Sequence, residues 1–347
     1  MINVGIAGIG FMGWIHWLAY KSVEGVNVAG IFARDEKKRA GDWSDIKGNF
    51  GPPGEQVDLS SVPSYESLDG LLNDSNIDVI DICLPPHMHL DAAIKSLKAG
   101  RHVFCEKPMA LKTEDCEAMV ATASNAGKQL LIAHVLPFFP EYAKARQIIE
   151  SGRYGKLLGG TFKRVISDPS WIADFYDPDR VGGPLVDLHV HDAHFIRLLF
   201  GMPRSVSSQG RMRGEVVEYC NTMFNFEEPS LVVSASSGVI NQQGRAFTHG
   251  FEIHLEKATM QYEFAVVDET PELLMPLTIY NDEGKVERPE LGDGDPIRAF
   301  EAEIKEMATS IESNHSSTTL SGNLAGDAIL ICHKQTESVK SGTCVSF

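Results

Sequence analysis

The sequence predicts an α/β domain with a doubly wound parallel sheet, followed by an α+β domain with an open, mostly antiparallel sheet. In residues 1–134, short apolar β runs alternate with helical segments, the pattern of a parallel sheet with helices on both faces. A glycine-rich turn joins the first β run to the first helix. After Pro137, alternating strands separated by polar turns indicate an antiparallel sheet with one solvated face. A length of 347 residues suits two domains, which we predict at 1–134 and 135–347.

The elements of the first domain follow from hydrophobic periodicity and turn residues. Apolar β runs predict strands at Ile2–Ala7, Val26–Phe32, Val62–Tyr65, Ile77–Leu84, His102–Cys105 and Gln129–His134. The intervening helices are expected at Phe11–Val23, Leu90–Lys98 and Thr113–Ala126.

The second domain is predicted by the same criteria. Its expected helices are Glu141–Glu150, Leu185–Phe200, Ile297–Glu312 and Leu320–Val339. Its expected strands are Lys156–Ile166, Val216–Phe226, Leu231–Val239, Phe251–Leu255 and Met260–Phe264.

Composition and charge exclude several classes of protein. Hydrophobic residues make up 43% and charged residues 22%, so the chain can fold around a core. The net charge of −16 leaves no basic footprint for nucleic acid and disfavours an anionic membrane surface. No apolar stretch is long enough to span a bilayer, and MINVGIAGIG lacks the features of a signal peptide. The six cysteines form no C-x-x-C pair, so we expect them to be reduced, in a cytoplasmic protein.

The glycine-rich turn is the first candidate binding site. Gly8, Gly10 and Gly13 fit G-x-G-x-x-G directly after a predicted strand and at the start of a predicted helix. The first glycine permits the tight turn, the second lets the backbone approach a pyrophosphate, and the third allows close helix–strand packing. Amides at the helix start, including those of Phe11 and Met12, then face the phosphates. The motif therefore predicts a bound nucleotide, with a glycine-rich turn that binds no ligand as the alternative.

The end of the second strand predicts which dinucleotide binds. Enzymes that use NAD usually place an acid there, bonded to the ribose 2′-OH. Here Ala33 occupies the expected acidic position and Arg34 follows it, so a 2′-phosphate has room and a cationic partner. This favours NADP(H) over NAD(H). A shift of one position would instead put Asp35 in the acidic role.

Three further segments contain groups suited to chemistry. CEKP, which includes Lys107, follows the fifth predicted strand, and LPPHMH follows the fourth. Ligands of open α/β sheets bind beyond the carboxyl ends of the strands. In GGPLVDLHVHD, Asp187 and His191 share one face if the segment is helical. The cofactor contacts predicted in the first two segments are Leu84, Pro85, His89, Glu106 and Lys107.

Together these segments resemble the Gfo/Idh/MocA oxidoreductase family. The matching motifs are GIGFMG followed by His16, LPPHMH, HVFCEKPMAL, HVLPFFPEYAKARQIIESGRYGKL and GGPLVDLHVHD. The resemblance implies a Rossmann domain, a second domain with an open sheet, and an active site between them. It also implies Lys107, Asp187 and His191 as the catalytic set. The implied substrate is a sugar, an inositol or a related polyhydroxylated molecule, and the bond before Pro108 is expected to be cis.

These residue types suit hydride transfer. When a hydride leaves a carbon, the hydroxyl on that carbon loses a proton, and His191 is the natural general base near neutral pH. Lys107 can stabilise the developing alkoxide, while Asp187 orients the histidine or the substrate. Asp187, His191 and His194 could also share a helical face as metal ligands. Most members of the family need no metal, and we expect none here.

Substrate contacts are predicted at His134, Arg164 and Trp171, with domain packing and a solvated loop as the alternative. Two other functions stay open. One is elimination or hydrolysis assisted by transient oxidation, after which the hydride returns to the substrate. The other is a cofactor-binding regulator without catalysis, which the intact catalytic set disfavours. We expect a homo-oligomer, a dimer or tetramer, because family members often associate through the exposed face of the second sheet.

Overall fold

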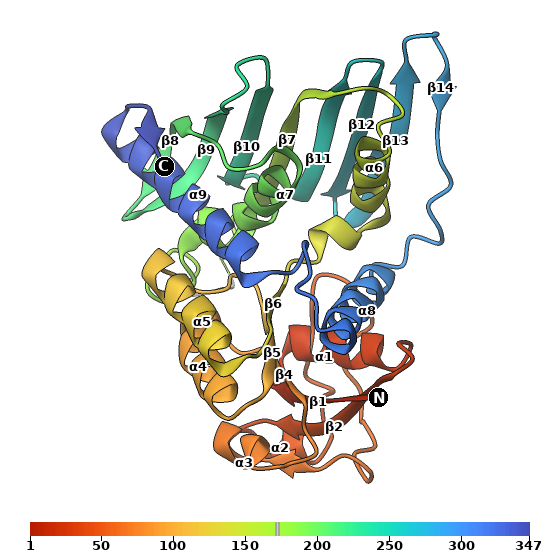
Figure 1. The fold of residues 1–347 in the computed structure, drawn as a ribbon, viewed down its shortest axis with the longest axis vertical. Helices are drawn as coiled ribbons and strands as arrows, with labels where there is room; N and C mark the ends of the chain where they lie inside the picture. The colour runs from red at the N-terminus through yellow and green to blue at the C-terminus, as the bar shows by residue number, and fades with distance from the viewer. Residues whose placement is uncertain (171, 173) are drawn as a thin grey trace. The chain divides into compact units, whose positions relative to one another are not determined.

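The computed structural model describes residues 1–170, 172 and 174–347, which divide into two compact units. The first unit consists of residues 1–139 and 293–326, and the second of residues 140–292 and 327–347 (Figure 1). This division differs from the predicted continuous second domain. Helix α8 (Ile297–Ser313) belongs to the first unit, because its apolar side chains join the core around helix α1 (Phe11–Tyr20). Burial of apolar side chains thus places α8, which lies late in the sequence, in the core of the first unit.

The sheet of the first unit is parallel, with strand order β3-β2-β1-β4-β5-β6. This order defines a doubly wound, dinucleotide-binding fold and confirms the predicted class. The strands are β1 (Ile2–Ala7), β2 (Val26–Phe32), β3 (Ser64–Tyr65), β4 (Val79–Ile82), β5 (His102–Glu106) and β6 (Leu130–Ala133). The strand order reverses between β1 and β4, so ligands are expected beyond the carboxyl ends of these strands.

The central strands of this sheet are buried on both faces. All four residues of β4 are buried, and so are all but one of those of β1, as expected for a parallel sheet covered by helices. The remaining helices of the first unit are α2 (Glu36–Arg39), α3 (Leu68–Leu72), α4 (His89–Lys98) and α5 (Thr113–Ala126). In Figure 1, α8 lies beside α1, far from it in sequence.

The second unit contains an open sheet with strand order β14-β13-β12-β11-β7-β10-β9-β8-β15. Strands β7 and β10 pair in parallel and the other neighbours are antiparallel, which confirms the prediction. The strands are β7 (Leu157–Ser167), β8 (Ser205–Arg213), β9 (Val216–Asn225), β10 (Val232–Ile240), β11 (Arg245–Leu255), β12 (Ala258–Val267), β13 (Thr270–Asn281), β14 (Val286–Glu287) and β15 (Val345–Ser346).

Helices α6 (Pro140–Glu150) and α7 (Val190–Phe200) pack on this sheet. The Tyr142 ring of α6 meets Phe195 of α7 and Phe251 of β11, each at a centroid distance of 5.1 Å, in edge-on contacts typical of aromatic cores. A π-helical turn, Leu185–His189, directly precedes α7, and α9 (Gly322–Ser341) is the last helix. No helix in the described part of the chain is both long and apolar enough to cross a bilayer.

Strands β8 and β13 were not among the predicted runs. The sequence of β8, SVSSQGRMR, is mostly polar, and β13 includes Pro271 and Pro276. Strand preference depends on neighbours more than on the strand's own residues. Pairing of β8 with β9 and β15, and of β13 with β12 and β14, therefore decides both elements.

Candidate active site

The loop after β1 has the geometry of a dinucleotide-binding turn. Gly8 has φ 106°, and a Cβ there would lie 2.7 Å from the carbonyl oxygen of Cys83. A Cβ on Gly13 would lie 2.2 Å from the carbonyl oxygen of Gly8, so the chain itself requires both glycines. A Cβ on Gly10, in contrast, would meet nothing within 4 Å. The chain leaves space at Gly10, and a pyrophosphate is the group that this glycine lets approach.

The start of α1 offers the matching donors. Gly10 is the N-cap residue and has no side chain that could cap the helix, and Phe11 and Met12 form its first turn as half-buried residues. The first amides of a helix have no partner within the helix and favour anions. Gly8, Gly10, Phe11, Met12 and Gly13 thus fit a bound pyrophosphate.

Two residues after β2, Arg34 and Asp35, are the candidates for recognition of the adenosine ribose, and their environments differ. Ala33 is buried, and Arg34 is exposed. The Asp35 carboxylate accepts a hydrogen bond of 2.8 Å from the Lys37 amide and caps α2. Lys38, which the sequence reasoning missed, donates to the carbonyl oxygen of Ile9 at 2.9 Å. Positive charge therefore lies beside the glycine loop, while Asp35 already has a structural partner.

The segments after β4 and β5 lie at the same carboxyl edge as the glycine loop, since β1, β4 and β5 are parallel neighbours. Leu84 is half-buried and Pro85 is exposed after β4. Lys107 follows β5 directly, and the Lys107–Pro108 bond is cis, as expected. Topology therefore brings together the predicted cofactor contacts of the first unit.

His89 and Glu106 lie at this edge, but their polar atoms contact the chain. The ring nitrogens of His89 lie 2.8 Å from the Pro108 carbonyl oxygen and 2.7 Å from that of Leu84. Burial lowers the pKa of this histidine. The Glu106 carboxylate accepts from the Lys107 amide at 3.0 Å. We therefore expect both residues to shape the cofactor site rather than bind the cofactor with their side chains.

A buried polar cluster lies beneath this edge, and sequence reasoning did not find it. His16 contacts Asp81 at 2.8 Å and Glu106 at 3.1 Å, and Tyr20 donates to Asp81 at 2.9 Å. Burial lowers the pKa of His16, but the charge of Asp81 and hydrogen bonding to it more than offset this, so the pKa is raised well above its usual value. One signal was available: Asp81 is an acid within the apolar run IDVIDICL, and a buried acid needs a partner.

Asp187 and His191 are placed by the helical segment that begins at Leu185. Asp187 lies in the π turn and His191 in the first turn of α7. Between Leu185 and Ile196, these two are the only residues that are not buried. The predicted helix is confirmed, and π turns occur often at functional sites. The second unit thus presents these two groups from a helical segment whose neighbouring residues are buried, while Lys107 belongs to the first unit.

Neighbouring polar residues hold this helix in place. The Arg164 guanidinium donates to both carboxylate oxygens of Asp192, at 2.6 and 3.2 Å, and both residues are buried. The Gln335 amide lies 3.0 Å from His189 Nε2, and burial lowers the pKa of His189 to about 4, so this histidine is neutral at pH 7. Arg164, predicted as a substrate contact, is therefore engaged inside the second unit.

The other predicted residues are placed as follows. His134 is buried, one residue after β6. His194 is buried in α7, on the same helix as His191. Trp171 lies outside the described residues.

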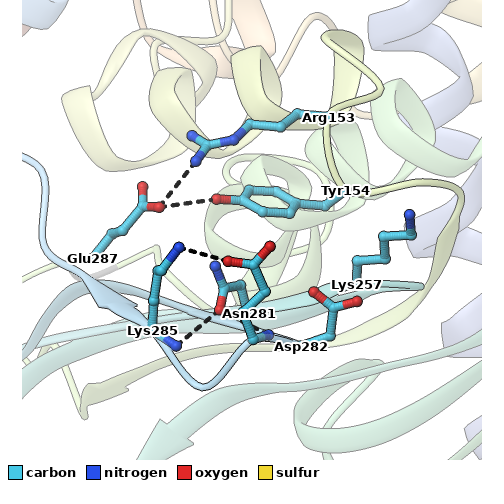
Figure 2. Close-up of a pocket in the computed structure, with 8 residues that line it drawn as sticks. Arg153, Tyr154, Lys257, Asn281, Asp282, Lys285 and Glu287 are labelled. Atoms are coloured by element: carbon cyan, nitrogen blue, oxygen red, sulfur yellow. Dashed lines mark hydrogen bonds and ion pairs between the residues drawn. The ribbon is translucent and has the colours of Figure 1, made fainter.

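One surface cavity of about 420 Å³ lies in the second unit and includes none of the predicted site residues. Figure 2 shows Glu287 reaching both Arg153 and Tyr154, at 3.0 and 3.2 Å. The other residues that line this cavity are Lys257, Asn281, Asp282, Glu283 and Lys285. Acids and bases are balanced along these walls, so the contacts join the α6–β7 corner to the β13–β14 hairpin and do not define a charged ligand.

The strand order and the glycine loop define a nucleotide-binding protein of the Rossmann class. Residues 2–134 match the family model "Oxidoreductase family, NAD-binding Rossmann fold", and residues 142–261 match the "GFO/IDH/MocA C-terminal domain". These two matches cover more than half of the chain. The chain therefore belongs to the Gfo/Idh/MocA oxidoreductase family, which confirms the resemblance.

Individual relatives agree with this assignment. The chain is 34% identical to an uncharacterized oxidoreductase of Rhizobium meliloti, over 40% of this chain and 41% of the relative. It is 26% identical to a 1,5-anhydro-D-fructose reductase of Ensifer adhaerens, over 72% of this chain and 74% of the relative. A structure of levoglucosan dehydrogenase with NADH and levoglucosan has the same fold, with a TM-score of 0.79, 21% identity, and 99% of both chains covered. The match to the first of these relatives spans about two fifths of its length.

Proposed function

We propose that this chain is a dehydrogenase that transfers hydride between a nicotinamide cofactor and a carbinol or keto carbon of a sugar-like molecule. The observation behind the proposal is that Lys107 shares the carboxyl edge of the parallel sheet with the space at Gly10. A cationic side chain is thereby placed where this fold class binds its ligands. Family membership and the named dehydrogenases and reductases among the relatives support the same reaction class.

The residues of the glycine loop would hold the pyrophosphate, and the cofactor would supply a hydride acceptor or donor. We assign the proton on the substrate hydroxyl to His191, which removes it as general base and returns it in the reverse direction. Lys107 donates a hydrogen bond to the alkoxide oxygen and stabilises its negative charge. Asp187, one helical turn before His191, orients the imidazole or a neighbouring hydroxyl.

Screening tests this function directly. Sugars, inositols and their keto forms are incubated with NAD(H) or NADP(H), and absorbance of the reduced nicotinamide is followed. We expect turnover of at least one polyhydroxylated compound. Product formation with no net change in nicotinamide would instead favour elimination or hydrolysis with a recycled hydride. Binding of the cofactor without turnover of any compound would favour a regulator.

We further propose that NADP(H) is preferred over NAD(H). Exposed Arg34 beside buried Ala33, and the structural use of the Asp35 carboxylate, support this choice. Arg34→Ala is expected to weaken NADP(H) binding about 10- to 100-fold, the range for loss of a charged hydrogen bond. Binding of NAD(H) should change little, because NAD(H) lacks the 2′-phosphate. Fluorescence titration measures both, and tighter NAD(H) binding that is insensitive to Arg34→Ala would contradict the preference.

The remaining expectations concern substrate contacts and assembly. We keep His134 and Trp171 as proposed substrate residues. A homo-oligomer is supported by exposed apolar side chains on the second sheet, such as Met223, Val232 and Leu273. A cytoplasmic location is supported by the six free cysteines.

A further inference from the structure

Two buried histidines lie on either side of the segment that contains Lys107. His89 contacts the carbonyl oxygen of Pro108, directly after Lys107. His16 contacts the carboxylate of Glu106, directly before Lys107, and that carboxylate accepts the Lys107 amide hydrogen. The backbone of Lys107 is therefore tied on both sides to side chains that come from α1 and α4.

The ring of His16 is held by hydrogen bonds at both nitrogens and by aromatic rings packed against it. Its Nδ1 lies 2.8 Å from the Asp81 carboxylate, and its face stacks on Phe104 with centroids 5.6 Å apart and planes 24° apart. Phe300 of α8 packs against it at 6.0 Å. His16 is fully buried, and a ring held this firmly can hold Glu106 in turn.

The hydrogen bonds between Asp81, His16 and Glu106 indicate where the protons of the His16 ring lie. Ionised carboxylates only accept hydrogen bonds, and a ring flanked by two of them donates from both nitrogens. Both ring nitrogens of His16 face a carboxylate oxygen, and its pKa is raised well above the usual value, which favours a ring protonated on both nitrogens. The other titratable groups near His16 are Tyr20, Cys83 and Glu303. Burial raises the pKa of Glu303 well above its usual value, and neither of its carboxyl oxygens has a hydrogen-bond partner among the described residues, so Glu303 does not compete for the ring.

Some of the same side chains could also serve as ligands of a metal ion. His16, Asp81 and Cys83 place one ligand-type atom each within 4.8 Å of one another. Nitrogen and oxygen ligands of a tetrahedral zinc ion lie about 3.3 Å apart, given bonds of about 2.0–2.1 Å. The Nδ1–Asp81 distance of 2.8 Å is instead that of a hydrogen bond. This distance therefore favours a hydrogen-bonded proton, and not a metal ion, between His16 Nδ1 and the Asp81 carboxylate.

We propose that His16 is a positioning residue which, through the Glu106 carboxylate, fixes the backbone from which Lys107 reaches the substrate. This inference rests on the proposed function only in the role given to Lys107. The contact from His16 Nε2 to Glu106 fixes the position of the Lys107 backbone. The contact from Nδ1 to Asp81 fixes the orientation of the imidazole ring. The two contacts can be separated by substitution.

Two variants test the proposal against each other. In His16→Gln the amide nitrogen replaces Nε2 and can still donate to Glu106. In His16→Asn it replaces Nδ1, so the contact with Asp81 is kept and that with Glu106 is lost. Each variant removes one buried contact, so each serves as the other's control for a merely structural effect. Thermal unfolding and NAD(P)H titration verify that both variants fold and bind cofactor.

Two measurements read out the result. Hydrogen exchange of the Lys107 amide, followed by NMR, should be at least about tenfold faster in His16→Asn than in the wild type and nearly unchanged in His16→Gln. The same order should appear in kcat, with KM little changed. Equal exchange rates in the two variants would overturn the proposal, as would a stoichiometric transition metal lost from both. If no compound is turned over, the proposed function fails while the exchange rates still decide the role of His16.

Discussion

Replacing Lys107 with methionine is expected to lower kcat/KM for the hydride transfer by about 10²- to 10³-fold, the usual effect of removing one donor from a developing oxyanion. Methionine preserves most of the length and apolar stem of lysine but removes the charge. The loss should fall mainly on kcat, because the alkoxide forms only as the reaction proceeds. Steady-state kinetics measure it, together with titration of NADP(H), whose affinity should be preserved because the glycine loop is untouched.

Lys98→Met is the matched control, since Lys98 is an exposed lysine at the end of α4 in the same unit. Its kinetics should equal those of the wild type. If Lys107→Met retained full kcat, the catalytic role assigned to this lysine would be wrong. This conclusion would hold whether the enzyme prefers NADP(H) or NAD(H).

Asp192→Asn should destabilise the second unit by about 3–5 kcal/mol, because it leaves the Arg164 guanidinium buried without its counter-charge. Both side chains are almost completely buried, and the arginine donates to both carboxylate oxygens. Phe247 also lies near the guanidinium, with the charge 5.8 Å from the ring centroid, and so do Tyr142 and Tyr262. Denaturant unfolding followed by circular dichroism measures the loss.

A second ion pair in the same unit gives the control. Arg197 and Asp327 are 2.9 Å apart but about a third exposed, so Asp327→Asn should cost less than about 1 kcal/mol. The double variant Arg164→Met with Asp192→Leu removes both buried charges and should recover most of the lost stability. Equal effects of Asp192→Asn and Asp327→Asn would show that burial does not set the strength of the Arg164–Asp192 pair.

Local features of the chain were readable from sequence because their physical causes are local. The glycine spacing reports clashes between residues a few positions apart, as at Gly13 and Gly8. Periodicity and apolar runs predicted the parallel sheet and the helix with Asp187 and His191. The boundaries of β1 and β2 were predicted to the residue, since buried runs of parallel strands end at turn residues.

Strands β8 and β13 and the place of α8 were not readable in this way. In each case the decisive contact comes from another part of the chain: a neighbouring strand for β8 and β13, and helix α1 for α8. The partners of single polar residues were not readable from sequence for the same reason. Arg164 and His89 looked available for a ligand, but their partners, Asp192 and Pro108, are 28 and 19 residues away.

The sequence alone therefore determined the class of fold and the nucleotide loop, because spacing along one strand, turn or helix carries that information, while the resemblance to a family supplied the three candidate catalytic residues. Only the tertiary structure decided which polar groups support them. His16 finds Asp81 and Glu106 at separations of 65 and 90 residues. A buried charge must find a partner wherever folding provides one, and no local pattern shows where in the chain that partner lies.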